Sequence, residues 1–325
     1  MSLPACLADL ADALYEKSVH PPRMSSAILE PFIARDGELL ALYEWERDSA
    51  PAGLQAPASG PRAMVLIVHG LGEHALRYDH VASQFVEWGF AVRSYDQRGH
   101  GESGGRRGAV PTEAALLYDL AEIVDDTRQR CLNQCSASGV MPLPLILLGH
   151  SMGGLIAARF VALGVRPVAG LVLSSPALNA GLTAFQRFKL KLGYRLAPNL
   201  CVGNGLDAQY ISHDEDVVRD YLADPLVHKK ISPRLASFIN RAGPPTVRAA
   251  ANWRTPTLLM FAGQDRLVNP EGSREFARIA AGSASVPPGL VTAHCFEGMY
   301  HEIMNERDSG QVFVRLKSWL DLHFA

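Results

Sequence analysis

Short apolar runs recur along the chain, and this recurrence constrains the fold more than any other feature of the sequence. Each run is soon followed by Gly, Asp or Pro, and the runs lie at residues 64–68, 91–95, 145–148, 170–173, 257–261 and 291–296. Such runs are typical of strands buried on both faces of a parallel sheet. Segments with helical spacing lie between them, at residues 81–88, 113–130, 155–163, 271–280 and 312–322. The alternation predicts an α/β fold with a mostly parallel sheet and helices on both faces.

The N-terminal part of the chain departs from this alternation. Residues 28–33 and 39–45 flank Asp36-Gly37, which is a signal for a tight turn. We therefore expect an antiparallel hairpin at the edge of the sheet.

A second departure follows Pro176, because no strand-like run appears again before Thr257. The segments at 185–196, 215–222 and 233–241 have helical spacing instead. We expect an inserted helical cap over the carboxyl ends of the strands, where open α/β sheets bind ligands. The predicted organisation is a first core part at 1–177, a cap at 178–245 and a second core part at 246–325.

Composition limits the partners of the chain. The formal net charge of −2 over 325 residues leaves no global field that would attract nucleic acid. No apolar run approaches the roughly 18 residues of a membrane-spanning helix. The five cysteines show no zinc-ligand spacing, which favours a reducing, cytoplasmic compartment and no metal cofactor. Cys131 and Cys135 lie four apart in a predicted helix, so a disulfide or a metal there stays open as an alternative.

The segment Gly149-His150-Ser151-Met152-Gly153 carries the strongest chemical signal. It follows the apolar run at 145–148 and precedes a helical segment, so the G-x-S-x-G pattern lies in the strand, turn and helix context that it requires. Such a sharp turn exposes a strained serine above the sheet edge. We predict Ser151 to be a nucleophile, against the alternative of an incidental serine in a glycine-rich turn.

A serine nucleophile needs a base, and the base needs an orienting acid. Asp265 follows the strand-like run at 257–261, and His301 follows the last run and precedes the final helix, which is the order Ser, Asp, His. We predict Asp265 as the acid and His301 as the base. The alternatives are a turn-forming role for Asp265 and Glu297 as the acid, although Glu297 is very near His301 in the sequence.

The turn His69-Gly70-Leu71-Gly72-Glu73 closes the run at 64–68, where this fold supplies one backbone N–H of an oxyanion hole. We assign the two donors to the amides of Leu71 and Met152. The alternative is a plain glycine turn.

The predicted cap contains a stretch, residues 182–196, with two distinct faces. Apolar side chains recur at spacings of three and four, at Leu182, Phe185, Phe188, Leu192 and Leu196. A basic stripe runs beside them, at Arg187, Lys191 and Arg195, with Lys189 as a further positive charge. This pattern favours peripheral contact with an anionic lipid surface. The alternative is a helix that buries its apolar face over the substrate pocket and leaves its basic face in water.

Several of these segments together resemble the monoacylglycerol lipase and lysophospholipase family of α/β hydrolases. They are the segments at 69–74, 95–103, 149–154, 175–178 and 300–302, and the resemblance runs from about Ile28 to the C-terminus, including Asp224-Pro225-Leu226. It implies an enzyme that hydrolyses carboxylic esters with a single acyl chain, with monoacylglycerol as the main candidate substrate. The enzyme would need no cofactor and would meet lipid at a membrane surface.

The resemblance also implies that Glu73 and Arg77 contact the alcohol part of the substrate, and the alternative is a structural ion pair. Other functions stay open: a lysophospholipase or a short-chain carboxylesterase would use the same three residues, and a ligand-binding protein would use the scaffold without catalysis. Residues 1–25 lie outside the resemblance.

Overall fold

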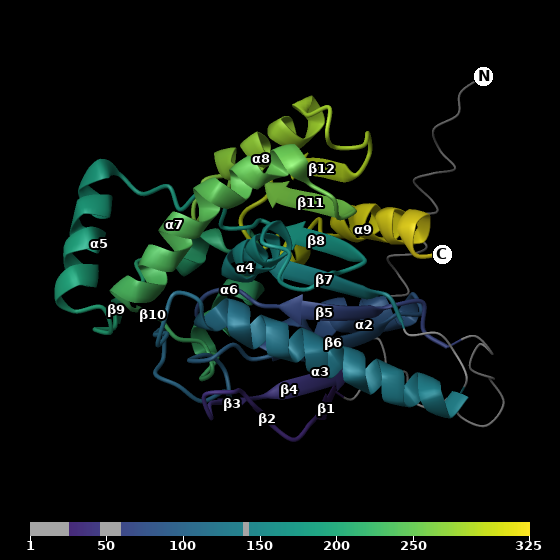
Figure 1. Cartoon of the computed structure of the whole chain (residues 1–325). Coiled ribbons are helices and arrows are strands. Elements are labelled where there is room, and N and C mark those ends of the chain that lie inside the picture. Colours follow the sequence, from purple (N-terminus) through teal and green to yellow (C-terminus); the bar gives the residue numbers. More distant parts are fainter. Residues whose placement is uncertain (1–25, 46–59, 139–142) are drawn as a thin grey trace.

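A computed structural model describes residues 26–45, 60–138 and 143–325. Residues 1–25, 46–59 and 139–142 lie outside the described residues. An eight-stranded sheet forms the centre, in the order β1-β4-β6-β5-β7-β8-β11-β12 (Figure 1). Its strands are β1 (Ser26–Ile28), β4 (Leu42–Trp45), β5 (Met64–Val68), β6 (Ala91–Tyr95), β7 (Leu145–His150), β8 (Gly170–Ser174), β11 (Thr257–Ala262) and β12 (Val291–Phe296).

The six strands predicted from the apolar runs are present, and all six run parallel to one another. The prediction of burial on both faces is wrong for β12, because it is the edge strand and most of its residues are exposed or half-buried. Some extend beyond the predicted end: β7, for example, continues to His150. The extension matters because it carries the chain to the carboxyl edge of the sheet immediately before Ser151.

The N-terminal hairpin is also confirmed, and it divides into two pairs of strands. At its tip, β2 (Phe32–Ile33) pairs with β3 (Leu39–Leu40), and Gly37 has a φ of 86° in the turn between them. At its base, β1 pairs antiparallel with β4, which adds antiparallel to β6 at the sheet edge. The division keeps the tip out of the main sheet.

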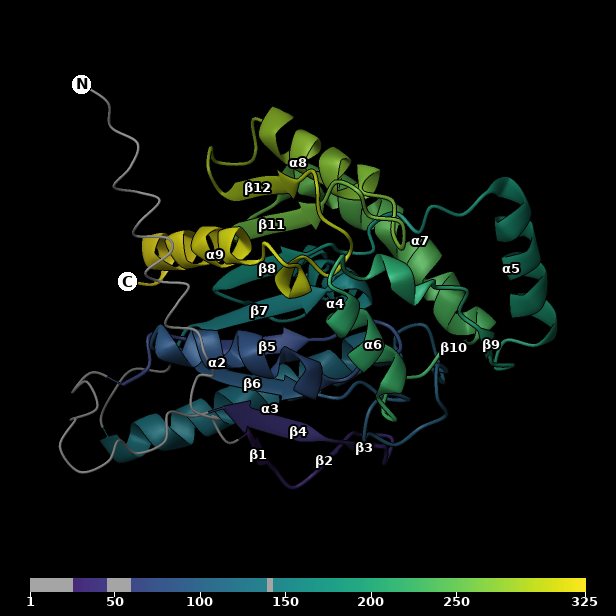
Figure 2. The ribbon, with the colours of Figure 1, turned by 180° about the vertical axis from the view of Figure 1, so that it is seen from behind.

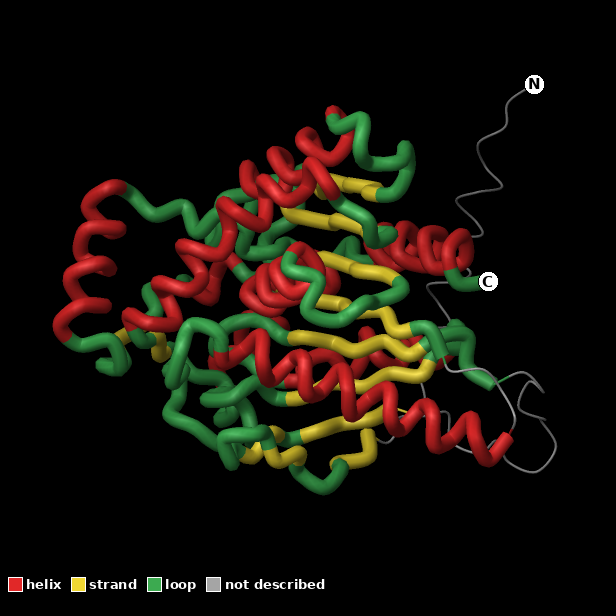
Figure 3. Tube along the Cα trace, in the orientation of Figure 1, coloured by secondary structure: helices red, strands yellow, loops and turns green. Residues whose placement is uncertain are grey.

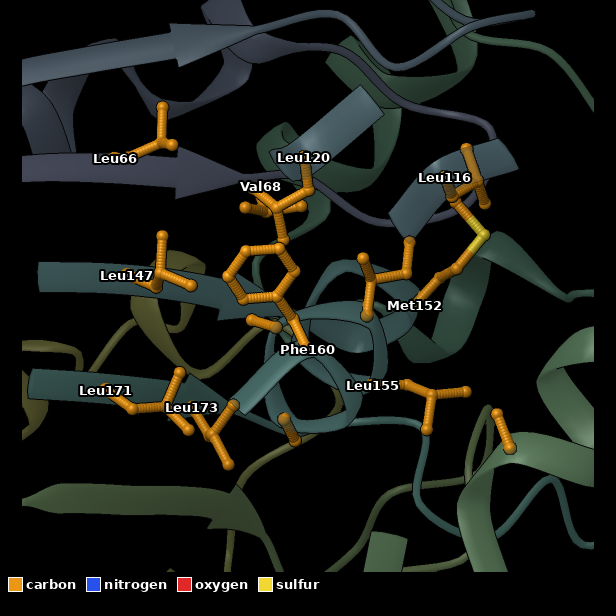
Figure 4. Packing of buried hydrophobic residues seen from close by; sticks show 14 of the residues in the cluster. Leu66, Val68, Leu116, Leu120, Leu147, Met152, Leu155, Phe160, Leu171 and Leu173 are labelled. Carbon is orange, nitrogen blue, oxygen red and sulfur yellow. The ribbon is translucent and has the colours of Figure 1, made fainter. Parts of the chain in front are cut away.

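Helices cover both faces of the sheet (Figures 1 and 2). On one face lie α3 (Ala115–Ser138), α4 (Ser151–Ala162) and α8 (Glu271–Gly282), and on the other lie α2 (Asp79–Glu87) and α9 (Gly310–His323). Figure 4 shows Leu66, Leu147 and Leu173 of the strands packed towards Phe160 of α4 and Leu120 of α3. Their sequence neighbours Ile67, Ile146 and Val172 point to the opposite face, as the alternation of side chains along a strand requires.

The predicted cap is present between β8 and β11. It comprises α5 (Ala184–Leu196), β9 (Val202–Gly203), a 3₁₀ turn at Ala208–Tyr210, α6 (Glu215–Ala223), β10 (Lys230–Ile231) and α7 (Pro233–Ala249). Figure 3 shows α5 standing away from the body of the molecule at the carboxyl edge of the sheet. The boundaries at 178 and 245 stay a prediction, and α7 continues past residue 245 along α4 and α8.

Candidate active site

Ser151 occupies a sharp turn between β7 and α4, and its φ of 53° lies in the left-handed region that side chains other than glycine rarely adopt. The neighbouring glycines make this turn possible. A side chain at Gly153 would collide with the carbonyl oxygen of Val68, and one at Gly149 would lie 2.6 Å from the carbonyl oxygen of Gly153. The close approach of α4 to β5 therefore depends on Gly153, and it holds Ser151 in the strained conformation expected of a nucleophile.

Asp265 and His301 form an oriented pair. The Asp265 carboxylate accepts a hydrogen bond from His301 Nδ1 at 2.6 Å through Oδ2, and from the N–H groups of Leu267 and Val268 at 2.9 and 3.0 Å through Oδ1. Both side chains are almost completely buried. Because Nδ1 is held by the carboxylate, the other ring nitrogen, Nε2, is the one available to accept a proton.

Glu297, the alternative acid, lies elsewhere. Its side chain is 71% exposed and pairs with Arg274 at 3.3 Å. The structure thus brings Asp265 to His301, whereas the other carboxylate faces solvent.

Burial and charge act against each other at this pair. Burial disfavours the charged imidazolium, but the carboxylates of Asp265, Glu302 and Glu73 outweigh it, so the pKa of His301 is raised above its usual value. Burial likewise disfavours the Asp265 carboxylate, but His301 and two backbone N–H groups keep the pKa of Asp265 below its usual value. The histidine is therefore a stronger base than in water.

Ser151 and His301 line one cavity of about 200 Å³. Most of the wall is apolar, and much of it comes from the insertion, through Leu182, Leu206, Ile211, Ile231, Ala236 and Ile239. Polar side chains gather in the same wall, at Glu73, His150, Asn204, Tyr221, Lys229 and Glu302. A long apolar group with a polar end matches this lining.

Leu71 and Met152 also line the cavity, as the oxyanion prediction requires. Met152 lies in the first turn of α4, whose N–H groups have no acceptor within the helix and carry the positive end of its dipole. The turn that carries Leu71 is held from two sides. Glu73 accepts the N–H of Gly70 at 2.5 Å, and His69 accepts the N–H of Gln97 at 2.9 Å through Nε2.

Glu73 and Arg77 form the ion pair that was the alternative to a substrate contact. Arg77 donates to Glu73 at 2.6 Å and to both oxygens of Glu302 at 2.8 Å. Tyr78 donates to Glu73 at 2.7 Å. Glu73 lines the cavity, whereas Arg77 is absent from its described lining. The two loops that carry Leu71 and His301 are therefore joined through one arginine.

Sequence reasoning missed Glu302 and His150. Glu302 follows His301 directly, and the only signal for it was its place in the quoted segment at 300–302. Burial disfavours its charge, but Arg77 and Asn305 lower the pKa of Glu302 to about 2. His150 lies 4.8 Å from His301 between ring centroids, and burial together with that neighbour lowers its pKa to about 4, so this second histidine is neutral at pH 7.

No group of acidic, histidine and cysteine side chains in the described ranges has a geometry that could hold a metal ion. None of the helices within the described residues combines the length and the apolar character needed to cross a bilayer.

Comparison with known proteins decides the family. A family model described as serine aminopeptidase, S33, matches residues 59–308. The chain belongs to this hydrolase family. It is 37% identical over 271 residues to a monoacylglycerol lipase of Mycolicibacterium smegmatis, over 82% of this chain and 91% of that protein. It is also 30% identical over 272 residues to phospholipase YtpA of Bacillus subtilis, over 81% of this chain and 97% of that protein.

A solved structure agrees with this assignment. The crystal structure of Paleococcus ferrophilus monoacylglycerol lipase superimposes with a TM-score of 0.69 at 31% identity, over 82% of this chain and 96% of that one. The α/β-hydrolase fold and the family resemblance expected from the motifs are confirmed.

Proposed function

We propose that the protein hydrolyses the ester bond of monoacylglycerols and releases a fatty acid and glycerol. One observation carries this proposal: Ser151 and the Asp265-oriented His301 line one mostly apolar cavity, and the insertion contributes much of its wall. The 37% identity to a monoacylglycerol lipase supports the same substrate class.

The proposed mechanism uses only side chains and backbone of the chain. Ser151 attacks the ester carbonyl while His301 accepts its proton, and the negative oxygen is stabilised by the N–H groups of Leu71 and Met152. The C–O bond to the alcohol then breaks, and His301 protonates the leaving alcohol. A water that gives its proton to His301 attacks the acyl-Ser151 ester, and the fatty acid leaves as Ser151 regains its proton.

The polar groups around the cavity favour an ester over a peptide with a free amino terminus. An α-ammonium group would need an unpaired carboxylate in the pocket. The two glutamates of the described lining, Glu73 and Glu302, are both held by Arg77. An uncharged alcohol such as glycerol does not compete with Arg77 for the carboxylates of Glu73 and Glu302.

A second candidate substrate is a lysophospholipid, and Lys229 favours it. Its side chain lines the cavity and is exposed, so it offers a positive charge to a phosphate beside the ester. The 30% identity to a phospholipase supports the same alternative.

A substrate series tests these proposals. Monoacylglycerols of increasing chain length should be hydrolysed faster than triacylglycerols and faster than a peptide-like amide of the same acyl group. Lysophosphatidylcholine is the competing substrate, and it is the better one if the parent hydrolyses it faster than monoacylglycerols. A selective loss of its hydrolysis rate in Lys229→Gln would show that Lys229 contacts the phosphate. If the protein hydrolysed only short esters, it would be a general carboxylesterase, and the lipase proposal would be contradicted.

We further propose that the protein is cytoplasmic and meets lipid peripherally through α5. No residue of α5 is buried, and Phe185, Phe188 and Leu196 are 63%, 63% and 73% exposed. The alternative prediction, burial of this face over the pocket, is therefore wrong for these side chains, although Leu182 before the helix does line the cavity. A helix with an exposed apolar face and a basic stripe suits an anionic interface.

Co-sedimentation with anionic vesicles tests this contact. Changing Arg187, Lys191 and Arg195 together to Gln should weaken binding at low salt, with roughly 1 kcal/mol lost per charge. The matched control changes Arg219, Arg241 and Arg278, which are exposed and lie on other helices, to Gln. Equal binding by the parent and the α5 variant would remove the interfacial role, whereas hydrolysis of a water-soluble ester should stay near the parent rate in both.

A further inference from the structure

A segment of the insertion lies directly against the loop that carries His301. The N–H of His301 donates to the carbonyl of Tyr210 at 3.4 Å, and the N–H of Glu302 donates to the carbonyl of Ile211 at 2.8 Å. Backbone hydrogen bonds from the insertion thus reach the proposed base itself and the residue after it. The two segments are about ninety residues apart in the sequence, so only the folding of the chain brings them into contact.

Glu306 joins the same two segments through its side chain. Its Oε1 accepts the N–H of Tyr300 at 2.6 Å and Nδ1–H of His213 at 2.8 Å, and its Oε2 accepts the N–H of His213 at 3.0 Å. Glu306 is only 6% exposed, so these hydrogen bonds lie in a region where a carboxylate is costly without partners. One carboxylate therefore holds the residue before His301 and a residue of the insertion at once.

Two further contacts close the joint. The ring of His213 stacks on the ring of Tyr300, with 3.6 Å between centroids and 19° between planes. Ser212 donates to the carbonyl of Asn305 at 2.9 Å. The segment 210–214 continues into α6 at Glu215, so a displacement of the insertion would act on this joint.

We propose that Glu306 is a positioning residue, which latches the insertion segment 210–214 to the catalytic loop and makes the placement of His301 depend on the docking of the insertion. The inference rests on the proposed function, because it assigns a task to His301. Glu306 is absent from the described lining of the cavity, and its carboxylate contacts Tyr300, His213 and, at 3.4 Å, the hydroxyl of Ser212.

The primary variant is Glu306→Gln, which keeps the shape but replaces one acceptor oxygen by an NH₂ group that cannot accept an N–H. We expect kcat on a water-soluble ester to fall between about tenfold and a hundredfold with KM little changed, because the base is misplaced while the cavity is intact. The control is Glu297→Gln, the same chemical change at the exposed acid that follows β12. It should leave both parameters unchanged.

A pair of variants at His213 separates the latch from general stability. His213→Phe keeps a ring to stack on Tyr300 and the main-chain N–H that donates to Glu306, but it removes the side-chain donor Nδ1–H. It should reproduce the loss of kcat. His213→Asn places an amide N–H near the position of Nδ1 and should restore most of kcat. In the double variant of Glu306→Gln and His213→Phe the losses should not add, because both remove one joint.

Amide hydrogen exchange measures how firmly the loop that carries His301 is held, and it does not depend on enzymatic activity. In Glu306→Gln and His213→Phe the peptide containing residues 300–306 should exchange faster than in the parent, while peptides of β5 and β7 stay protected. Additive losses, or parent-like kcat and exchange in a folded Glu306→Gln or His213→Phe protein, would overturn the proposal. A parent that hydrolyses no ester would overturn the proposed function. The exchange result would still show whether Glu306 and His213 hold the insertion to the loop at 300–306.

Discussion

The carboxyl edge of the sheet and the helix α5 face the same side of the molecule and are built in opposite ways. At the sheet edge, His301 and Asp265 are almost fully buried and every nitrogen or oxygen assigned to orientation has a partner at 2.6–3.0 Å. In α5 no residue is buried, and its contacts with the rest of the protein run mainly to α7. Chemistry needs groups held before the substrate arrives, whereas delivery of a lipid needs a surface free to meet it.

The largest effect is expected at the nucleophile. Ser151→Ala should reduce turnover of a short ester to near background, because no other side chain can form the acyl-enzyme. The fold should persist, and the melting temperature should stay near that of the parent, because alanine keeps the Cβ atom and meets the same steric strain at a φ of 53°. Retained turnover in the purified variant would place the nucleophile elsewhere.

The next largest effect is expected at the orienting acid. Asp265→Asn should lower kcat by roughly 10³- to 10⁴-fold with KM little changed, because an amide can hold the wrong tautomer of His301. Glu297→Gln is the matched control and should behave as the parent. A larger loss in the control than in the Asp265 variant would reverse the assignment of the acid.

Packing gives a stability test of the two regions. Phe160→Ala in α4 should lower the free energy of unfolding by about 3–5 kcal/mol, because its ring is completely buried between β7, β8 and α3. Phe188→Ala in α5 should change it by less than about 0.5 kcal/mol, because this ring is 63% exposed. Chemical denaturation measures both, and a comparable loss in the α5 variant would show that α5 belongs to the core.

The smallest effect concerns the basicity of His301. The charge of Glu302 raises the pKa of His301, so Glu302→Gln should lower that pKa. Catalysis needs neutral His301 and is lost as the pH falls below its pKa, so the acidic limb of kcat/KM should move to lower pH in the variant. Profiles from about pH 5 to about pH 9 measure the shift, and a limb that moves upward would contradict the electrostatic account.

Much of the core could be predicted because its signals are local. Most of the buried strands are continuous apolar runs, and Ser151 stands in a pattern of five residues between a strand-like run and a helical segment. Asp265 is preferred over Glu297 because Glu297 lies too near His301 on the same loop to orient it, and the structure pairs Asp265 with His301. These signals can be read without knowing which segments meet.

The remaining features depend on contacts between distant segments. Beyond its place in the segment 300–302, Glu302 has no signal for its role, because that role comes from Arg77, 225 residues away. The joint of His213 and Glu306 spans 93 residues and leaves no periodic pattern. The surroundings of α5 also could not be predicted from its two faces. An amphipathic pattern shows that one face is apolar, but it does not show what that face contacts.

The most direct test of the central claim is mass spectrometry of the protein after reaction with a fluorophosphonate that carries a long alkyl chain. The assignment of Ser151 and His301 predicts a single adduct on the peptide that contains Ser151. The adduct should form rapidly in the parent and much more slowly in His301→Ala, and prior incubation with a monoacylglycerol should block it. An adduct on another residue, or none in a parent preparation that hydrolyses esters, would contradict this assignment.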